Sequence, residues 1–211
     1  MSTIAVIGSN GRAAKAIIDE LVSRGHDVTG FARGADNHST AQEYVSKDLF
    51  DLNKADLAPF EVVINAFGAW TPETLDLHTK ASMHLADILS GTKTRLLVVG
   101  GAGSLYVSDK HDVQLFETAD FPKEYYPLAK AQAQALEALR ERSDVEWTFI
   151  SPAADFQAEG ERTGRYIRAG EEFTLNSDGE SVISYADYAI GFVDEIESGH
   201  HLKERISLLG R

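Results

Sequence analysis

The chain has 211 residues, 43% of them hydrophobic, and carries 33 acidic against 20 basic side chains, a net charge of −13. This length and composition predict one soluble domain, residues 1–211. Its negative charge repels phosphate backbones and anionic lipid. We therefore expect a small-molecule substrate and neither nucleic acid nor membrane as a partner. There is no cysteine, which excludes disulfides and thiol catalysis. With no leader and no membrane-spanning stretch in view, we expect a cytoplasmic protein that is a monomer or a homodimer.

The first thirty residues predict a β-α-β unit. Thr3–Ile7 is a short apolar, β-branched run, typical of a strand buried on both faces of a parallel sheet. Gly8, Gly11 and Ala14 follow at three-residue spacing. Apolar residues then recur at helical spacing until Gly25, where a left-handed helix end is expected, and a second strand follows.

The glycine spacing indicates where a nucleotide would bind. Small residues keep the turn tight, let backbone N–H groups approach a pyrophosphate, and let the helix pack close to the strand. The same spacing also serves ordinary strand-to-helix connections, so a purely structural turn is the alternative. We expect the pyrophosphate to be contacted by Gly8, Ser9, Asn10, Gly11, Arg12 and Ala13.

The end of the second strand bears on the choice of dinucleotide. An NAD site usually places an acid there for the ribose 2′-hydroxyl, whereas an NADP site offers an arginine to the 2′-phosphate. Arg33 follows this strand, and Arg12 supplies a second cation in the glycine turn. NADP(H) is therefore favoured. Asp36 keeps NAD(H) as an alternative, and a solvated surface arginine is the other reading of Arg33.

Two further strands are predicted at Glu43–Ser46 and Val62–Ala66. In an open parallel sheet the ligand lies beyond the carboxyl ends of the strands, so Asp48 would meet the adenine amino group. A helix cap is the alternative role for Asp48. The segment after the second of these strands would border the adenine ribose. We place in the cofactor site Asp48, Leu49, Ala66, Phe67 and Gly68.

The next predicted helix runs from Thr71, as N-cap, to about Leu89, with Pro72 in its first turn. It carries His78 and His84. These two are six residues apart and do not share a helix face, and no cysteine or carboxylate spacing supports them, so we expect no metal site.

A glycine-rich segment follows the predicted strand Arg95–Val99 and leads to Ser104. Further along, Tyr126 and Lys130 are four residues apart, on one face of a predicted helix. A lysine ammonium beside a phenol eases proton transfer and can hold the nicotinamide ribose, while a serine hydroxyl can hold the substrate oxygen. We therefore name Ser104, Tyr126 and Lys130 as candidate catalytic residues.

Pro127 argues against a regular Tyr-Lys pair. Proline disfavours helical geometry at the residue before it, so Tyr126 could sit at the N-cap with its phenol turned away from Lys130. Tyr125 could instead be the tyrosine that points inward. The alternative for the pair is a surface lysine and a tyrosine that packs on the preceding loop.

The rest of the chain predicts a substrate-side segment, 153–184, after a strand at Trp147–Ser151. Pro152, at the exit of this strand, would face the nicotinamide. Within the segment, Phe173–Leu175 and Val182–Ser184 flank a turn sequence suited to a hairpin. A helix beginning at Ser184 and Asp187 and a last strand at Ile206–Leu209 complete the chain. Aromatic side chains at strand exits that could stack on a ring substrate are Trp70, Tyr106 and Phe156.

Four stretches together resemble the atypical short-chain dehydrogenase/reductases. More narrowly, they resemble the short NmrA-like proteins provisionally named NADH-flavin reductases, relatives of the biliverdin-IXβ/flavin reductases. The resemblance implies a doubly wound, Rossmann-type α/β fold with helices on both faces, residues 8–14 on the pyrophosphate, Arg33 on the 2′-phosphate and Ser104 as the family serine. The stretches are IAVIGSNGRAAKAIIDELVSRGHDVTGFAR, LLVVGGAGSLYV, WTFISPAADFQAEGERTGRY and ISYADYAIGFVDEIE.

These observations leave three functional hypotheses. The leading one is an NAD(P)H-dependent reductase of a small conjugated acceptor such as a flavin or a quinone. The second is a non-catalytic NAD(P)-binding redox sensor, and the third is an epimerase or dehydratase that retains its nucleotide. Only about sixty residues follow the strand at 147–151, which favours a small or planar substrate over a sugar nucleotide.

Overall fold

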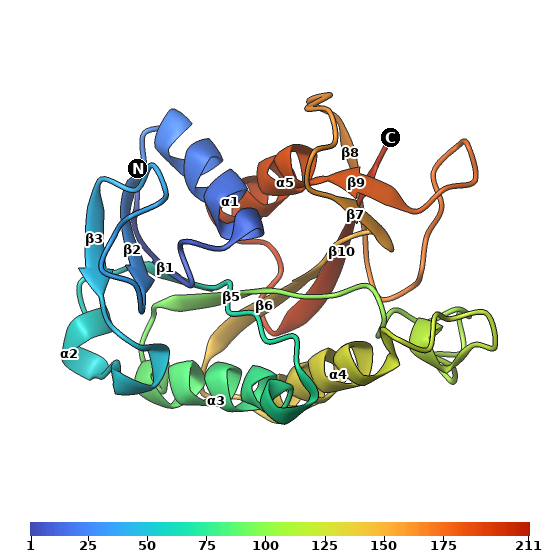
Figure 1. Ribbon diagram of the computed structural model, residues 1–211, viewed down its shortest axis with the longest axis horizontal. Coiled ribbons are helices and arrows are strands. Elements are labelled where there is room, and N and C mark those ends of the chain that lie inside the picture. The colour runs from blue at the N-terminus through green and yellow to red at the C-terminus, as the bar shows by residue number, and fades with distance from the viewer.

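A mostly parallel sheet of eight strands runs through the protein (Figure 1). The computed structural model describes residues 1–211. Neighbouring strands follow the order β3-β2-β1-β4-β5-β6-β10-β8, in which only β8 is antiparallel, and the first six have the order of a Rossmann-type sheet, which confirms the predicted fold class. The bounds are β1 Thr3–Ile7, β2 Asp27–Ala32, β3 Glu43–Ser46, β4 Val62–Asn65, β5 Arg95–Val99, β6 Glu146–Ser151, β8 Tyr166–Ala169 and β10 Glu204–Gly210.

Helices cover both faces of the sheet. In Figure 1, α1 and α5 lie above the sheet, and α3 and α4 lie below it. No helix is long and apolar enough to cross a membrane. The α-helices are α1 Arg12–Ser23, α2 Lys54–Leu57, α3 Leu77–Leu89, α4 Tyr126–Arg140 and α5 Tyr185–Ser198, and short 3₁₀ helices span Leu49–Asp51, Pro72–Thr74 and Leu115–Glu117.

Strand β1 shows how the sequence builds the two layers. Its neighbours β2 and β4 pair with it in parallel, so its side chains alternate between two covered faces. Ile4 and Val6 join the core cluster that contains α1 and α5, whereas Ala5 and Ile7 join the cluster that contains α3. All four are at most 2% exposed, which explains the continuous apolar run.

Parallel pairing brings several strand exits to one edge of the sheet. The register aligns Ile7 of β1 with Phe31 of β2 and Asn65 of β4, and Val99 of β5 with Ile150 of β6. The glycine turn and the segments that begin at residues 66, 100 and 152 therefore leave the sheet on the same side. Ligands of open α/β sheets bind at this edge.

The helix predicted from Thr71 to Leu89 begins later than expected. Thr71 does precede a helical turn with proline at its start, but that turn is the 3₁₀ helix Pro72–Thr74 and Thr71 makes no side-chain cap. Helix α3 starts only at Leu77 and ends at Leu89, as predicted.

The hairpin predicted around residues 173–184 is wrong. Val182–Ser184, strand β9, pairs in parallel with β7, Asp155–Gln157, to form a separate two-stranded sheet. Residues 171–173 pair with Tyr106 instead. The Tyr106 N–H donates to the carbonyl of Glu171, and the Tyr106 carbonyl accepts the N–H of Phe173. The turn itself forms through Asn176, whose side-chain oxygen accepts two backbone N–H groups.

Ser184 caps α5 as predicted. Its hydroxyl accepts the N–H of Asp187 at 3.0 Å. The Asp187 carboxylate does not return the bond to Ser184; it accepts the hydroxyl of Thr163 at 2.6 Å and the N–H of Gly164 at 2.9 Å. The helix start thereby fixes the substrate-side segment against α5.

Candidate nucleotide site and the network behind Ser104

The glycine turn is wedged between the ends of β2 and β4. Gly8 and Ser9 both donate their N–H groups to the carbonyl of Phe31, at 2.8 and 3.2 Å. Gly8 has a φ of +81°, and a Cβ placed on it would lie 2.8 Å from the carbonyl oxygen of Ala66. Only glycine satisfies both the backbone conformation and this close approach.

The N-terminus of α1 is open to an anion. Gly11 is the N-cap and offers no side chain, and the first turn carries no acidic residue. The N–H groups of Arg12 and Ala13 have no backbone acceptor, as expected for the first turn of a helix. Such N–H groups and the helix dipole bind phosphate, so these residues fit the pyrophosphate of a dinucleotide.

The side chains of Ser9 and Asn10, two predicted contact residues of this turn, lie against other parts of the protein. The Ser9 side chain is fully buried, and its hydroxyl has no hydrogen-bond partner. A Cβ on Gly30 of β2 would lie 2.7 Å from that hydroxyl, so Ser9 fills the space that Gly30 leaves. Asn10 turns its side chain toward the loop after β2, where it donates to the carbonyl of Asp36 at 3.0 Å.

Arg33 stands free at the carboxyl end of β2. Its side chain is 82% exposed, and the nearest acid is Asp48 at 3.9 Å. Asp48 itself accepts the N–H of Phe50 at 2.9 Å and caps the 3₁₀ helix that follows, which is the alternative role foreseen for it. Leu49 is buried in the core, so its side chain is unavailable to a ligand.

The exit of β4 lies directly across from the glycine turn. Ala66 donates its N–H to Ile7 at 2.9 Å, and the next N–H, of Phe67, is taken by the side chain of Asn65 at 3.1 Å. Trp70 is 74% exposed, and its indole lies 3.2 Å from where a Cβ on Gly68 would be. Pro152, at the exit of β6, is buried.

Ser104 is buried against Arg205, an arginine that the sequence did not single out. Nη1 of Arg205 donates to the Ser104 hydroxyl at 3.1 Å, and Nη2 donates to the Ser104 carbonyl at 3.1 Å. Ser104 is 3% exposed, and the Arg205 side chain is 0% exposed. Arg205 also lies 3.4 Å from the hydroxyl of Ser151, at the end of β6.

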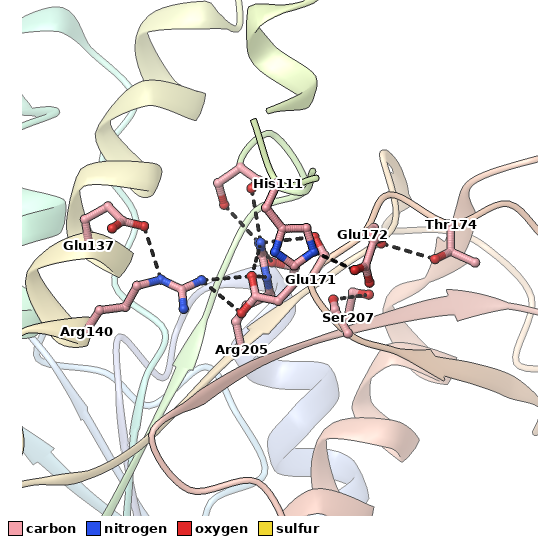
Figure 2. Close-up of polar contacts among 11 residues, drawn as sticks. His111, Glu137, Arg140, Glu171, Glu172, Thr174, Arg205 and Ser207 are labelled. Carbon is pink, nitrogen blue, oxygen red and sulfur yellow. Dashed lines mark hydrogen bonds and ion pairs between the residues drawn. The ribbon is translucent and has the colours of Figure 1, made fainter. Parts of the chain in front are cut away.

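A chain of alternating charges leads from Arg205 through Glu171 and Arg140 to Glu137, as Figure 2 shows, and Glu137 is exposed. Nε of Arg205 donates to Glu171 at 2.9 Å, and Arg140 on α4 donates to both oxygens of the same carboxylate at 2.9 and 2.8 Å. Arg140 also binds Glu137 at 3.1 Å. Burial lowers the pKa of the Arg205 guanidinium, and Glu171 acts in the opposite direction.

The structure does not bring Ser104 together with Tyr126 and Lys130 through any hydrogen bond. Tyr125 is the N-cap of α4 and Tyr126 its first residue. The Tyr126 ring is 41% exposed and meets Phe116 edge-on at 5.4 Å, beside an open surface pocket. Lys130 is exposed. Ala129 packs beside Phe116 and against Gly103 in the loop after β5, whereas Leu136 and Leu139 join the core cluster that contains α3. This geometry matches the packing role that was the alternative.

The other two predicted substrate residues lie in separate aromatic groups. Tyr106 stacks on His111 with ring centres 4.5 Å apart. The ring of Phe156 on β7 packs against the ring of Tyr185, with ring centres 4.1 Å apart. The Arg12 guanidinium lies over the Tyr185 ring, 5.9 Å from its centre. Tyr185, the first residue of α5, therefore joins the glycine turn to the substrate-side segment; sequence reasoning missed it because it reads as an ordinary helix residue.

The two histidines of α3 serve the fold. Nε2 of His78 donates to the carbonyl of Ala69 at 3.0 Å, and Nε2 of His84 lies 3.1 Å from the carbonyl of Leu52. No group of three or more histidine, aspartate or glutamate side chains is arranged to hold a metal ion.

His78 is expected to make stability depend on pH. Burial lowers the pKa of its imidazole from the ordinary value of 6.5, so the unfolded chain takes up a proton at a higher pH than the folded chain does. The free energy of unfolding should therefore fall as the pH drops below about 6.5 and level off once the folded protein is also protonated. Urea unfolding of wild type and His78→Phe across this range measures the effect. An unchanged slope in the variant would contradict it.

The family model described as NAD(P)H-binding matches residues 8–196 of the chain. This range begins at Gly8, the first residue of the glycine turn. The chain belongs to the NAD(P)H-binding family. The match therefore agrees with the free N–H groups at the start of α1.

Relatives of this NAD(P)H-binding protein cover its full length. A crystal structure from Streptococcus pneumoniae, provisionally named an NADH-flavin reductase, is 56% identical with a TM-score of 0.98, and each chain covers 100% of the other. The uncharacterized protein YwnB of Bacillus subtilis is 44% identical over 98% of this chain and 97% of its own. ChuY, an anaerobillin reductase of Escherichia coli O157:H7, is 15% identical with a TM-score of 0.73 over 99% of this chain and 97% of its own, and shows the fold alone.

Proposed function

We propose that this protein is an NAD(P)H-dependent reductase of a small conjugated acceptor such as a flavin or a quinone. The observation that carries the proposal is the open N-terminus of α1 beside the close approach of Gly8 to Ala66. The family and the name of the Streptococcus pneumoniae relative support the same class. The bound nicotinamide would supply a hydride, and the protein would supply binding and orientation.

The positions of Tyr126 and Lys130 support the choice of a flavin or quinone as the acceptor. A simple ketone needs a proton donor at its oxygen as hydride arrives, which calls for a tyrosine and a lysine at the reacting atoms. Tyr126 instead packs on Phe116, and Lys130 faces solvent. A reduced flavin or quinone spreads its negative charge over the ring and can take its proton from water. Ser104 would then position the ring, and Trp70, Tyr106 and Phe156 are the aromatic candidates to contact it.

A non-catalytic redox sensor is the second candidate. The locked contact between Arg205 and Ser104 favours it, because a hydroxyl held in this way has less freedom to follow a reacting substrate. Absorbance of NADPH, followed with FMN, riboflavin and quinones as acceptors, distinguishes the two. Oxidation of NADPH with any of them supports the reductase, and tight NADPH binding without turnover supports the sensor.

We further propose that NADP(H) is the preferred nucleotide and that Arg33 contacts its 2′-phosphate. Arg33→Ala is expected to weaken NADPH binding by about 1–3 kcal/mol, the range for a hydrogen bond to a charged group. NADH lacks this phosphate and should lose far less affinity. Calorimetric titration of both nucleotides measures the difference, and equal losses would remove Arg33 from this role.

A further inference from the structure

The loop after β2, residues 33–40, has no regular secondary structure, and side chains from three other elements hold it. From α1, Asp19 accepts the hydroxyl of Thr40 at 2.5 Å. From the glycine turn, Asn10 donates its side-chain N–H to the carbonyl of Asp36 at 3.0 Å and accepts the N–H of His38 at 2.9 Å. From β3, the Tyr44 hydroxyl donates to the carbonyl of Gly34 at 2.7 Å. We call residues 33–40 the Arg33 loop.

The side chains of Asn10 and Tyr44 also touch each other. The side-chain N–H₂ of Asn10 donates to the Tyr44 hydroxyl at 3.3 Å, as well as to the loop. The Asn10 amide thus uses both of its hydrogens and its oxygen within the protein. It links the glycine turn, the Arg33 loop and β3, and no hydrogen of the amide is left to donate to a ligand.

The Arg33 side chain itself is left free. Ser46 lies 3.4 Å from the Arg33 carbonyl, so the main chain of Arg33 is tied to β3 at the start of the loop. Its side chain is 82% exposed, and its one ion-pair contact is with Asp48 at 3.9 Å. The backbone of the loop is therefore fixed before any ligand arrives, while the cation at its base remains available.

We propose that Asn10 and Tyr44 are positioning residues that hold the Arg33 loop ready for the 2′-phosphate of the nucleotide, and so set the preference for NADPH over NADH. The inference rests on the proposed function. A loop ordered during folding does not have to be ordered during binding, so the bound complex loses less entropy. NADH offers no phosphate to Arg33 and gains little from this order.

Tyr44→Phe is the main test, because it removes one hydroxyl and keeps the ring. The dissociation constant for NADPH should rise about three- to tenfold, the range for one hydrogen bond, and that for NADH should rise less than about twofold. Tyr166→Phe, which removes a hydroxyl that donates to Asp194 of α5 at 2.5 Å, on the opposite edge of the sheet from β3, is the matched control and should leave both constants unchanged. Calorimetric titration measures all four.

Asn10→Ala gives a second readout that does not depend on nucleotide. It removes the acceptor of the His38 N–H, so hydrogen exchange at His38 should become faster while the β1 amides stay protected. Faster exchange together with a selective loss of NADPH affinity supports the inference. Equal losses for both nucleotides, or unchanged NADPH affinity in both variants, overturn it. Wild-type protein that binds neither nucleotide overturns the proposed function as well.

Discussion

Gly8→Ala is expected to abolish measurable NADPH binding and to lower the free energy of unfolding by about 1–3 kcal/mol. An alanine is strained at the φ of +81°, and its Cβ would lie 2.8 Å from the carbonyl oxygen of Ala66. That carbonyl cannot easily retreat, because the N–H of the same residue is bonded to Ile7 at 2.9 Å. The turn must shift, and the N–H groups of α1 shift with it. Urea unfolding and calorimetric titration measure the two effects.

Gly25→Ala is the matched control for this prediction. Gly25 follows the other end of α1 with the same φ of +81°, and nothing lies within 4 Å of a Cβ placed there. The variant therefore has the backbone strain, about 1–2 kcal/mol, without the collision, and it should bind NADPH like wild type. If both variants lost NADPH binding, the close approach of Gly8 to Ala66 would not be the cause.

Local patterns in the sequence were sufficient to predict the parallel core. Thr3–Ile7, Glu43–Ser46 and Arg95–Val99 are strands with the predicted bounds. The first and the last are β-branched or apolar runs between clear turn or helix signals, whereas Glu43–Ser46 is a short, mostly exposed edge strand. The open N-terminus of α1 also follows from sequence, since Gly11 cannot provide a side-chain cap. These features depend only on residues close together in the chain.

Features that depend on distant partners were not predictable in this way. The antiparallel edge strand β8 pairs with β10, about forty residues later, and its half-buried residues lack a regular alternation. Helical spacing correctly placed Tyr126 and Lys130 on α4, but it does not determine the rotation of the helix. Ala129 packs toward Phe116 and Gly103 in the loop after β5, and Lys130 is exposed.

Sequence-based prediction of the candidate site is limited in the same way. Asn10 looks like a ligand contact in the sequence, but its partners Asp36 and Tyr44 lie 26 and 34 residues away. Ser104 looks like a free catalytic serine, but Arg205 binds it from 101 residues away. An arginine directly before the predicted apolar strand Ile206–Leu209 is the one signal that could have drawn attention to this network. In the structure β10 begins at Glu204, so Arg205 lies inside the strand, where a buried charge requires a partner.

Arg205→Met is expected to cost about 3 kcal/mol of stability, the low end of the range for breaking a buried ion pair. Methionine is apolar and of similar length, but it leaves the carbonyls of Ser104 and Glu171 without the donor that reaches them at 3.1 and 3.2 Å. The Glu171 carboxylate, 24% exposed, keeps Arg140 as a partner, which moderates the loss. Urea unfolding measures the change.

Arg140→Met provides the comparison, because it removes the other arginine bound to the same carboxylate. The Arg140 side chain is 30% exposed, so its loss is expected to cost less than about 1 kcal/mol. The cost for Arg205 should exceed this because its guanidinium is 0% exposed and also binds the segment of Ser104. If the two variants were equally stable, the buried arginine would contribute no more than a surface ion pair. The Ser104 segment would then be held by the packing of Ala129 on Gly103, and Gly103→Ala, whose Cβ would lie 2.5 Å from that of Ala129, would become the more damaging change.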